Sequence, residues 1–382
     1  MRIEQIELIE VQVPARAGAI NSPSLDKPLH KLATGADAAW TRQFDEFPKV
    51  LLVATTEDGT VGYGESLRAP DMPTLRAMAR GLAGRDVAAL AWQNLPLAKN
   101  REYDGFELLV LDLLAKRAGL PLASLLGGSY RSEVPVSAWS GHRTPDEAAM
   151  IAERAQRNGA TTLKLKCELD DDVVEIAAAV RERCGDGFSL IFDPNERFEE
   201  LRHAVKIARG LERIGNVVCL EDPLPRWDLG AYAELRARTS IPIAIHVALG
   251  YLSHGQRISD VTSAIASRAA DVFNFSAGIA DFLRMAHIAD AAGRPYWHGS
   301  EIDLGIMEAG AVHAAAASAG ATLPSDIFGR LIRETDLLRT PLSITGSAVS
   351  VPEGPGLGVE LDLDAVAAHE LSRELVTAVV AR

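Results

Sequence analysis

From Val134 onward, short apolar segments alternate with amphipathic helical segments, and this alternation constrains the fold more than any other feature of the chain. Seven such apolar segments occur: Val134–Ser140, Thr162–Cys167, Ser189–Asp193, Val217–Glu221, Ile241–His246, Asp271–Ser276 and Pro295–His298. An eighth is expected near residues 325–328. Strands separated by helices pair in parallel. The count predicts closure into a barrel, in which chemistry is expected at the carboxyl ends of the strands.

The residues before this region predict a smaller α+β domain. Residues 3–13 and 49–56 alternate in polarity like strands, and residues 73–83 and 106–117 have helical periodicity. The tail after Pro352 alternates again and predicts a strand that returns to this domain. We expect residues 1–127, with residues 351–382, to form a capping domain over a barrel of residues 128–350.

Composition excludes several classes of protein. The length of 382 residues suits a barrel of about 250 residues plus a smaller domain. No apolar stretch approaches the roughly 20 residues of a membrane helix, and Met1–Glu7 lacks the features of a secretory signal, so we expect a soluble, cytoplasmic protein without a membrane partner. The net charge of −13 argues against a nucleic-acid partner. Cys167, Cys184 and Cys219 are too scattered for a disulfide framework.

Two lysines, Lys164 and Lys166, occupy alternate positions at the end of one apolar segment. In a strand, residues two apart share a face, so both ammonium groups would point the same way. Neighbouring positive charges lower each other's pKa, and a lysine tuned in this way accepts a proton. Asp193 and Glu221 each close their own segments, so a barrel would bring all four to one rim. The alternative is a solvated Lys-x-Lys on an edge strand.

These motifs, taken in order, resemble those of the enolase superfamily, in its mandelate racemase and muconate lactonizing branch. The matching stretches are Val61-Gly62-Tyr63-Gly64-Glu65, the run from Asp112 to Gly128, Lys164-x-Lys166, Asp193-Pro194-Asn195, Glu221-Asp222-Pro223 and Pro355-Gly356-Leu357-Gly358-Val359-Glu360. The resemblance covers nearly the whole chain. It implies a (β/α)₇β TIM-like barrel with an α+β N-terminal lid domain.

The resemblance also implies an activity. Lys166 would remove the proton α to a carboxylate, with help from Lys164, and a divalent cation such as Mg²⁺ would stabilise the enediolate. Asp193 and Glu221 would be two of three metal ligands, and Asn195 would lie near the substrate. The expected partner is a small anionic carboxylate substrate, and a homo-oligomer is expected from the family.

The third metal ligand departs from the family pattern. The family has an acid at the end of the fifth strand, where this chain has His246. Magnesium prefers oxygen ligands, whereas imidazole suits zinc, manganese or iron. His246 is therefore either a substitute ligand or a barrel histidine bonded to a neighbour.

The base opposite Lys166 also departs from the pattern. The muconate branch has a lysine after the sixth strand, where this chain has Ser276. The racemase branch uses an Asp–His dyad, for which Asp271 and His298 offer the residue types. Another register places Tyr296 at the histidine position. The alternative to the dyad is an Asp271 that caps a helix and an unrelated His298.

Other residues are expected to contact the substrate. Glu301 aligns with a family acid near the substrate carboxylate, while Asp303 is less favoured. His30 and Lys31 lie in the long segment Ala15–Trp40, which is expected to form a lid loop. All of these could instead be solvated loop residues.

We therefore expect an enzyme that dehydrates a hydroxy or sugar acid, a lyase, with His298 as the acid on the leaving-group side. A racemase or epimerase and a cycloisomerase, which are isomerases of the same family, are the alternatives. A degenerate barrel without a normal metal site and a Schiff-base aldolase are further alternatives from other classes.

Overall fold

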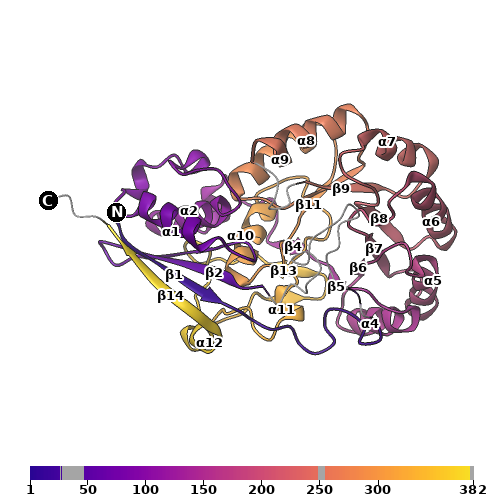
Figure 1. Ribbon diagram of the computed structural model, residues 1–382, viewed down its shortest axis with the longest axis horizontal. Coiled ribbons are helices and arrows are strands. Elements are labelled where there is room, and N and C mark those ends of the chain that lie inside the picture. The colour runs from indigo at the N-terminus through magenta and orange to yellow at the C-terminus, as the bar shows by residue number, and fades with distance from the viewer. Residues whose placement is uncertain (26, 28–46, 248–253, 379–382) are drawn as a thin grey trace.

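The computed structural model describes residues 1–25, 27, 47–247 and 254–378, excluding the side chains of residues 254 and 255 (Figure 1). His30 and Lys31 lie outside the described residues, so their expected role in a lid loop stays a prediction. No helix in the described part of the chain is long and apolar enough to cross a membrane.

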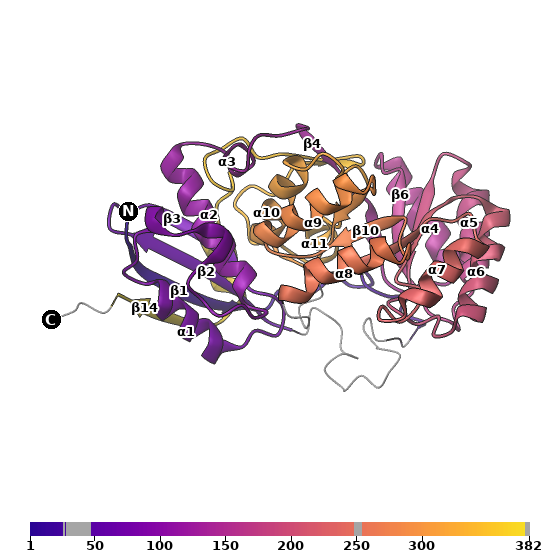
Figure 2. The same cartoon turned by 90° about the horizontal axis from the view of Figure 1, so that it is seen from above.

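An antiparallel sheet and two helices form the N-terminal part of the molecule (Figures 1 and 2). The sheet has the order β14–β1–β2–β3. Apolar residues alternate along its strands, so that Ile6, Leu8 and Leu52 pack in one core with Leu109 and Leu113 of a helix. The elements are β1 (Ile3–Val11), β2 (Lys49–Thr56), β3 (Val61–Glu65), α1 (Met72–Leu82), α2 (Tyr103–Ala118) and β14 (Glu370–Thr377), with short helices η3 (Val87–Ala89), η4 (Trp92–Asn94) and α3 (Leu122–Leu125).

The C-terminal tail returns to this sheet, because β14 pairs antiparallel with β1 from Gln5↔Thr377 to Val11↔Glu370. The returning strand that the tail predicted is thus confirmed. The expected boundaries of the two domains stay a prediction.

A curled parallel sheet forms the rest of the molecule, in the order β11–β10–β9–β8–β7–β6–β5. Its strands are β5 (Ala138–Ser140), β6 (Thr162–Lys166), β7 (Ser189–Asp193), β8 (Val217–Glu221), β9 (Ile243–Val247), β10 (Val272–Phe275) and β11 (Tyr296–His298). The helices that alternate with them lie around the outside of the sheet (Figure 1). They are α4 (Pro145–Arg157), α5 (Val173–Cys184), α6 (Leu201–Ile214), α7 (Leu229–Arg238), α8 (His254–Ala266), α9 (Ile279–Ala291) and α10 (Gly305–Ala316).

The eighth position of the barrel is filled by an irregular segment, residues 320–326. Its backbone bonds to one edge strand of the sheet and to the residues just before the other: Tyr296 N donates to Gly320 O, Asp326 N donates to His298 O, and Ser325 N donates to Pro135 O, ahead of β5. The expected eighth element therefore closes the ring, although only isolated bridges form there.

The strands are buried on both faces, which explains their nearly continuous apolar sequences. Inward-facing side chains form a small cluster of Ile191, Cys219, Ala244, Val272 and Trp297. The expected inward orientation of Cys219 is confirmed, and burial raises the pKa of its thiol well above the usual value.

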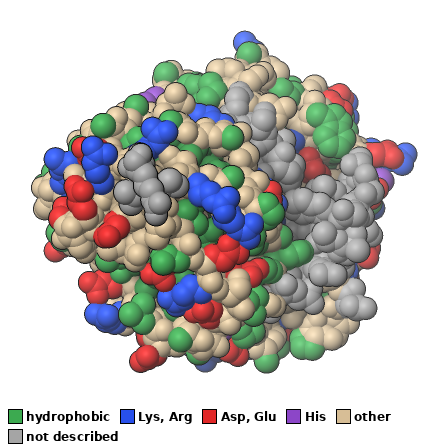
Figure 3. All heavy atoms as spheres, turned by 60° about the vertical axis from the view of Figure 1, so that its left-hand side comes forward, with side chains coloured by type: hydrophobic (Ala, Val, Ile, Leu, Met, Phe, Trp, Pro, Cys, Tyr) green, Lys and Arg blue, Asp and Glu red, His purple; other side chains and the backbone are tan. Residues whose placement is uncertain are grey.

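A small antiparallel sheet and two short helices complete the described structure. The sheet consists of β12 (Ile344–Thr345), β13 (Ala348–Ser350) and β4 (Glu133–Pro135), and the helices are α11 (Gly329–Ile332) and α12 (Leu363–His369). Figure 3 shows acidic and basic side chains interspersed over one face of the molecule.

Candidate active site

The four residues predicted to meet at one rim of the barrel do so. Lys164 and Lys166 come from the end of β6, Asp193 from the end of β7 and Glu221 from the end of β8. Lys164 Nζ lies 2.7 Å from Glu221 Oε2 and 3.4 Å from Asp193 Oδ2. Lys166 Nζ lies 2.5 Å from the same Asp193 oxygen. The alternative of a solvated Lys-x-Lys on an edge strand is therefore wrong.

Lys164 is a fixed positive charge. Its side chain is only 3% exposed, and burial disfavours the charged form. The carboxylates of Asp326, Glu221 and Asp193 outweigh burial and raise the pKa of Lys164 well above its ordinary value. The expectation that neighbouring lysines lower each other's pKa is wrong for Lys164, because three carboxylates surround it.

Lys166 is positioned by two side chains from β7 and the turn after it. Its Nζ donates to Asp193 Oδ2 at 2.5 Å and to Asn195 Oδ1 at 2.6 Å. Asn195 has a φ of 45°, a left-handed conformation that asparagine adopts more readily than most residues. Its backbone N–H donates to Asp193 Oδ1 at 3.2 Å. Burial acts to raise the pKa of Asp193, but the charges of Lys166 and Lys164 have the larger effect. The pKa therefore lies below its ordinary value, and the carboxylate stays ionised.

A small cavity lies over these groups. One wall is the stacked pair of Trp139 and Phe328, whose ring centroids are 4.9 Å apart. Arg68, which follows β3, reaches the cavity and pairs with Glu301 at 3.4 Å. The lining residues are Arg68, Trp139, Lys164, Lys166, Asp193, Asn195, Glu221, His246, Ser300, Glu301, Ile302, Asp326 and Phe328. The N-terminal part and the barrel thus both contribute to the site.

Of the two acids considered as substrate contacts, Glu301 and Asp303, the structure places Glu301 in this cavity. Burial raises the pKa of Glu301, and Arg68 opposes this shift. Asp303 instead accepts from Lys49 at 2.9 Å and from Ser300 at 2.8 Å, and it does not line the cavity. The preference for Glu301 over Asp303 as a substrate contact is consistent with this placement.

Three residues of the site were not anticipated from the sequence. Asp326 Oδ2 lies 2.9 Å from Lys164 Nζ. Asn274 Nδ2 donates to Glu221 Oε1 at 2.8 Å. Asp326 was detectable as the acid within the expected eighth segment, and Asn274 as the inward residue of the sixth strand. Nothing in the sequence distinguished Arg68 from the other arginines.

His246 is a buried histidine with a hydrogen-bond partner. Its Nε2 lies 2.7 Å from Ser276 Oγ, while its Nδ1 is 3.6 Å from Glu221 Oε1. Burial lowers the pKa of His246 well below the usual value, and Arg226 and Lys164 add to the shift. The imidazole is therefore neutral, which agrees with the interpretation of a barrel histidine bonded to a neighbour.

The expected metal ligands do not fit Mg²⁺. Because Mg–O distances are about 2.0–2.1 Å, octahedral ligand atoms lie within about 4.2 Å of one another. Among the described residues at this rim, the ligand atoms that gather within 4.8 Å belong to Glu221, Asp222 and His246, without Asp193. Asp222 has other partners: Oδ1 accepts from His246 N at 2.9 Å, and Oδ2 accepts from Arg226 at 2.6 Å.

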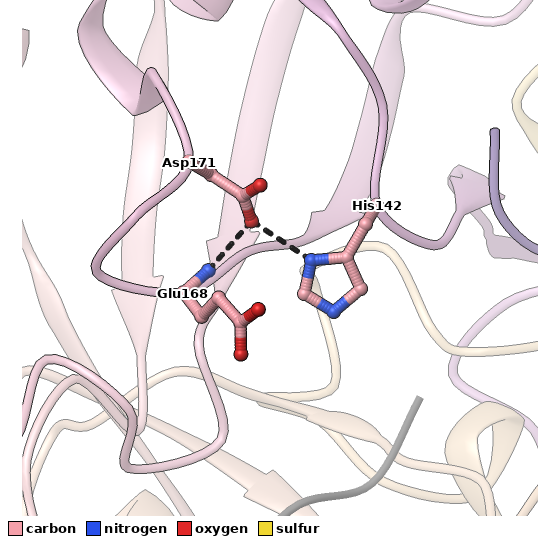
Figure 4. A group of neighbouring side chains, drawn as sticks. All are labelled: His142, Glu168 and Asp171. Atoms are coloured by element: carbon pink, nitrogen blue, oxygen red, sulfur yellow. Dashed lines mark hydrogen bonds and ion pairs between the residues drawn. The ribbon is translucent and has the colours of Figure 1, made fainter. Parts of the chain in front are cut away.

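A second group of possible metal ligands lies beside the rim (Figure 4). His142 Nδ1 lies 2.8 Å from Asp171 Oδ2, which also accepts from Glu168 N at 2.9 Å. Lys27 Nζ lies 2.9 Å from Glu168 and 2.7 Å from Asp171. The side chain of Lys27 therefore already supplies the positive charge that this acidic group needs.

The predicted Asp271–His298 dyad is wrong. Asp271 lies immediately before β10, at the amino end of the barrel. Its carboxylate pairs with Arg236 and accepts from Ile243 N at 3.1 Å. His298 ends β11 at the opposite, carboxyl rim. Because the strands are parallel, the two side chains cannot form a pair.

Tyr296 and His298 both have structural partners. The Tyr296 hydroxyl donates to Asp290 Oδ2 at 3.1 Å, and its ring packs on Phe275, so the predicted substrate contact is wrong. The His298 ring stacks on Phe282 at 4.6 Å, and its Nδ1 donates to Gly299 O at 2.7 Å. Trp297, between them, is the inward residue of β11.

Comparison with known proteins identifies the family. A family model described as "Enolase C-terminal domain-like" matches residues 146–365. The chain belongs to the enolase superfamily. Muconate cycloisomerase 1 of Rhodococcus opacus is 29% identical to it, over 91% of this chain and 96% of that protein. L-Ala-D/L-Glu epimerase of Bacillus subtilis is 26% identical, over 94% and 97%.

Solved structures agree with this assignment. The muconate lactonizing enzyme of Pseudomonas fluorescens superimposes with a TM-score of 0.79 and 26% identity, covering 97% of this chain and 99% of that one. The N-succinyl Arg/Lys racemase of Bacillus cereus shares the fold, with a TM-score of 0.81, 22% identity and coverage of 98% and 100%. This superfamily member is therefore an enzyme of the mandelate racemase and muconate lactonizing branch, and its predicted fold class is confirmed.

Proposed function

We propose that this enzyme moves a proton at the carbon α to the carboxylate of a small organic acid, with Lys166 as the group that carries the proton. The observation that carries the proposal is the placement of Lys166. Its Nζ lines the cavity beside the fixed charge of Lys164 and is oriented by Asn195. General acid–base catalysis requires a proton carrier held in this way.

Lys164 and Arg68 are cationic side chains in the lining of the cavity that the carboxylate of a substrate would contact. When the α-proton leaves, negative charge develops on the oxygens of the substrate carboxylate. A preformed ammonium in a buried site stabilises such charge without rearrangement. Lys164 therefore suits the role of electrostatic stabiliser. The Mg²⁺ expected from the resemblance forms no part of this scheme, because the donor set does not fit it.

The reaction that fits this site best is an isomerisation, as in a cycloisomerase, in which the proton is transferred on the face of the substrate that Lys166 contacts. Dehydration was expected to use His298 as the acid for the leaving group, but that ring stacks on Phe282 and lies outside the lining of the cavity. The relatives named as cycloisomerases support an intramolecular addition or elimination, which needs one proton carrier.

Dehydration of a hydroxy or sugar acid is the second candidate, because Glu301 lies in the same cavity and its pKa is raised by burial. A protonated Glu301 would supply the acid that His298 does not. Epimerisation would also need Glu301 or another group as a second proton carrier on the opposite face.

A substrate screen in deuterated water tests the proposal. Dienoic diacids, lactones, acid sugars, hydroxyprolines and N-acyl amino acids are incubated with wild type, Lys166→Ala and the exposed-site control Lys206→Ala, and followed by NMR. We expect deuterium at the α-carbon with wild type and the control only. A lactone labelled on one face indicates a cycloisomerase, and loss of water indicates the second candidate. Equal incorporation by Lys166→Ala would overturn the proposal.

A further inference from the structure

The ammonium group of Lys164 lies among three carboxylates at the centre of the rim. Its Nζ is 2.7 Å from Glu221, 2.9 Å from Asp326 and 3.4 Å from Asp193. The Lys164 side chain is almost fully buried, so the ammonium cannot turn away into solvent. A cation is thus already present where the acids of three strands or segments converge.

Most of the carboxylate oxygens that a metal ion would need already face a donor or an ammonium group, although among the described residues Asp326 Oδ1 has no hydrogen-bond partner and Glu221 Oε2 has only the ion pair with Lys164. Glu221 Oε1 accepts from Asn274, and Glu221 Oε2 faces Lys164. Asp193 Oδ2 faces both lysines, and Asp193 Oδ1 accepts from the Asn195 backbone. An ion bound at either carboxylate would lie close to an ammonium group, and like charges repel.

The two ammonium groups also offset most of the negative charge that would hold a divalent ion. The ammonium groups of Lys164 and Lys166 face the carboxylates of Asp193, Glu221 and Asp326, which leaves a formal charge of −1. An acid at position 246 would bring the charge to −2, but His246 is held by Ser276. Zinc accepts imidazole but usually has at least three protein ligands. Of the three described residues whose ligand atoms gather here, Asp222 is paired with Arg226 and Glu221 with Lys164.

We propose that Lys164 takes over the electrostatic role of a divalent cation, and that the rim binds no such ion. The catalytic part of this inference rests on the proposed function. Lys166 first releases a proton from its ammonium group to solvent. The resulting amine takes the α-proton and becomes an ammonium again, and the electron pair of the broken C–H bond passes to the substrate carboxylate. Lys164 keeps its own proton throughout and faces the enediolate oxygens.

The test is metal binding to the full-length protein, which needs no substrate. Wild type, His246→Asp and the control Lys206→Ala are dialysed against EDTA, then against Mg²⁺, Mn²⁺ or Zn²⁺, and bound metal is measured together with the midpoint of thermal unfolding. We expect no stoichiometric metal in wild type or control and an unfolding midpoint unchanged by EDTA or metal. In His246→Asp we expect the restored acid to bind Mg²⁺ and to raise the midpoint, because a ligand of the native state stabilises it.

One bound metal ion per chain in the wild-type protein would overturn the inference, whether or not His246→Asp also binds one. That result would leave the proposed function intact as long as α-proton exchange still requires Lys166. Conversely, exchange that persists in Lys166→Ala would overturn the proposed function, while the metal measurements would still decide the state of the rim. As a further check, exchange by wild type should proceed at the same rate in EDTA.

Discussion

Lys49 Nζ, on the second strand of the antiparallel sheet, lies 2.9 Å from Asp303 Oδ1 in the loop after β11. The same ammonium pairs with Glu65. Glu65 in turn accepts the backbone N–H groups of Leu304 and Met307 at the start of α10. Glu65, at the end of the stretch Val61-Gly62-Tyr63-Gly64-Glu65, thus fixes the N-terminal antiparallel sheet to the barrel, next to the loop that carries Glu301.

Lys49→Met should destabilise the protein by about 3–5 kcal/mol, because it leaves the buried carboxylates of Glu65 and Asp303 without their cation. Urea unfolding at pH 7 measures the change. The matched control is Arg339→Met, which removes a pair with Glu360 whose two side chains are both 64% exposed. Such surface pairs contribute about 0–1 kcal/mol. Equal losses in the two variants would contradict a structural role for Lys49.

Asp271→Asn should lower stability by about 1–2 kcal/mol and leave the rate of α-proton exchange unchanged. Asp271 pairs with Arg236 and Arg294 at the amino end of the barrel, whereas the site lies at the carboxyl ends of the strands. Its pKa is lowered, so its contribution to stability is present at neutral pH and is lost as the pH falls through its folded pKa. Parallel measurements of unfolding and exchange check this. If Asp271→Asn kept its full stability but lost most of its α-proton exchange, a catalytic role for Asp271 would be supported instead.

Glu107→Gln should change how stability depends on pH. Glu107, in α2, is fully buried, and burial together with Asp104 raises its pKa to about 8 from 4.5. The folded state therefore keeps this proton up to about pH 8, whereas the unfolded state releases it near pH 4.5. Stability must fall as the pH rises through this interval. Glutamine has no such proton to lose and preserves the acceptor for Ala280 N.

Urea unfolding at pH 5 and pH 8 measures the difference between Glu107→Gln and wild type. The variant should gain in stability relative to wild type at pH 8, with a smaller difference at pH 5. A constant difference at both pH values would show that Glu107 titrates normally in the folded protein.

The rim was predictable from the sequence because strand geometry is simple. Residues two apart share a face, and the ends of parallel strands meet at one edge, so Lys164, Lys166, Asp193 and Glu221 had to converge once the barrel was inferred. The same argument covers Cys219, which shares the parity of Glu221.

The errors arose where this geometry was not applied or was ambiguous. Asp271 lies immediately before its strand, so position alone excluded it from the carboxyl rim. β11 has only three residues, Tyr296–His298, and so short a strand gives no periodicity from which to choose the inward side chain. The engagement of Lys164 by Asp326 depends on an irregular segment that closes the barrel, and no local pattern predicts such a contact.

The exchange of a substrate α-proton with deuterated water, measured for wild type and Lys166→Ala on the substrate found in the screen, tests the central claim most directly. Removal of a general acid–base group costs about 10²–10⁴-fold in rate, so exchange by Lys166→Ala should fall by at least about 100-fold while its thermal unfolding remains cooperative. The control Lys206→Ala should exchange at the wild-type rate. Exchange by folded Lys166→Ala at the wild-type rate would contradict the account.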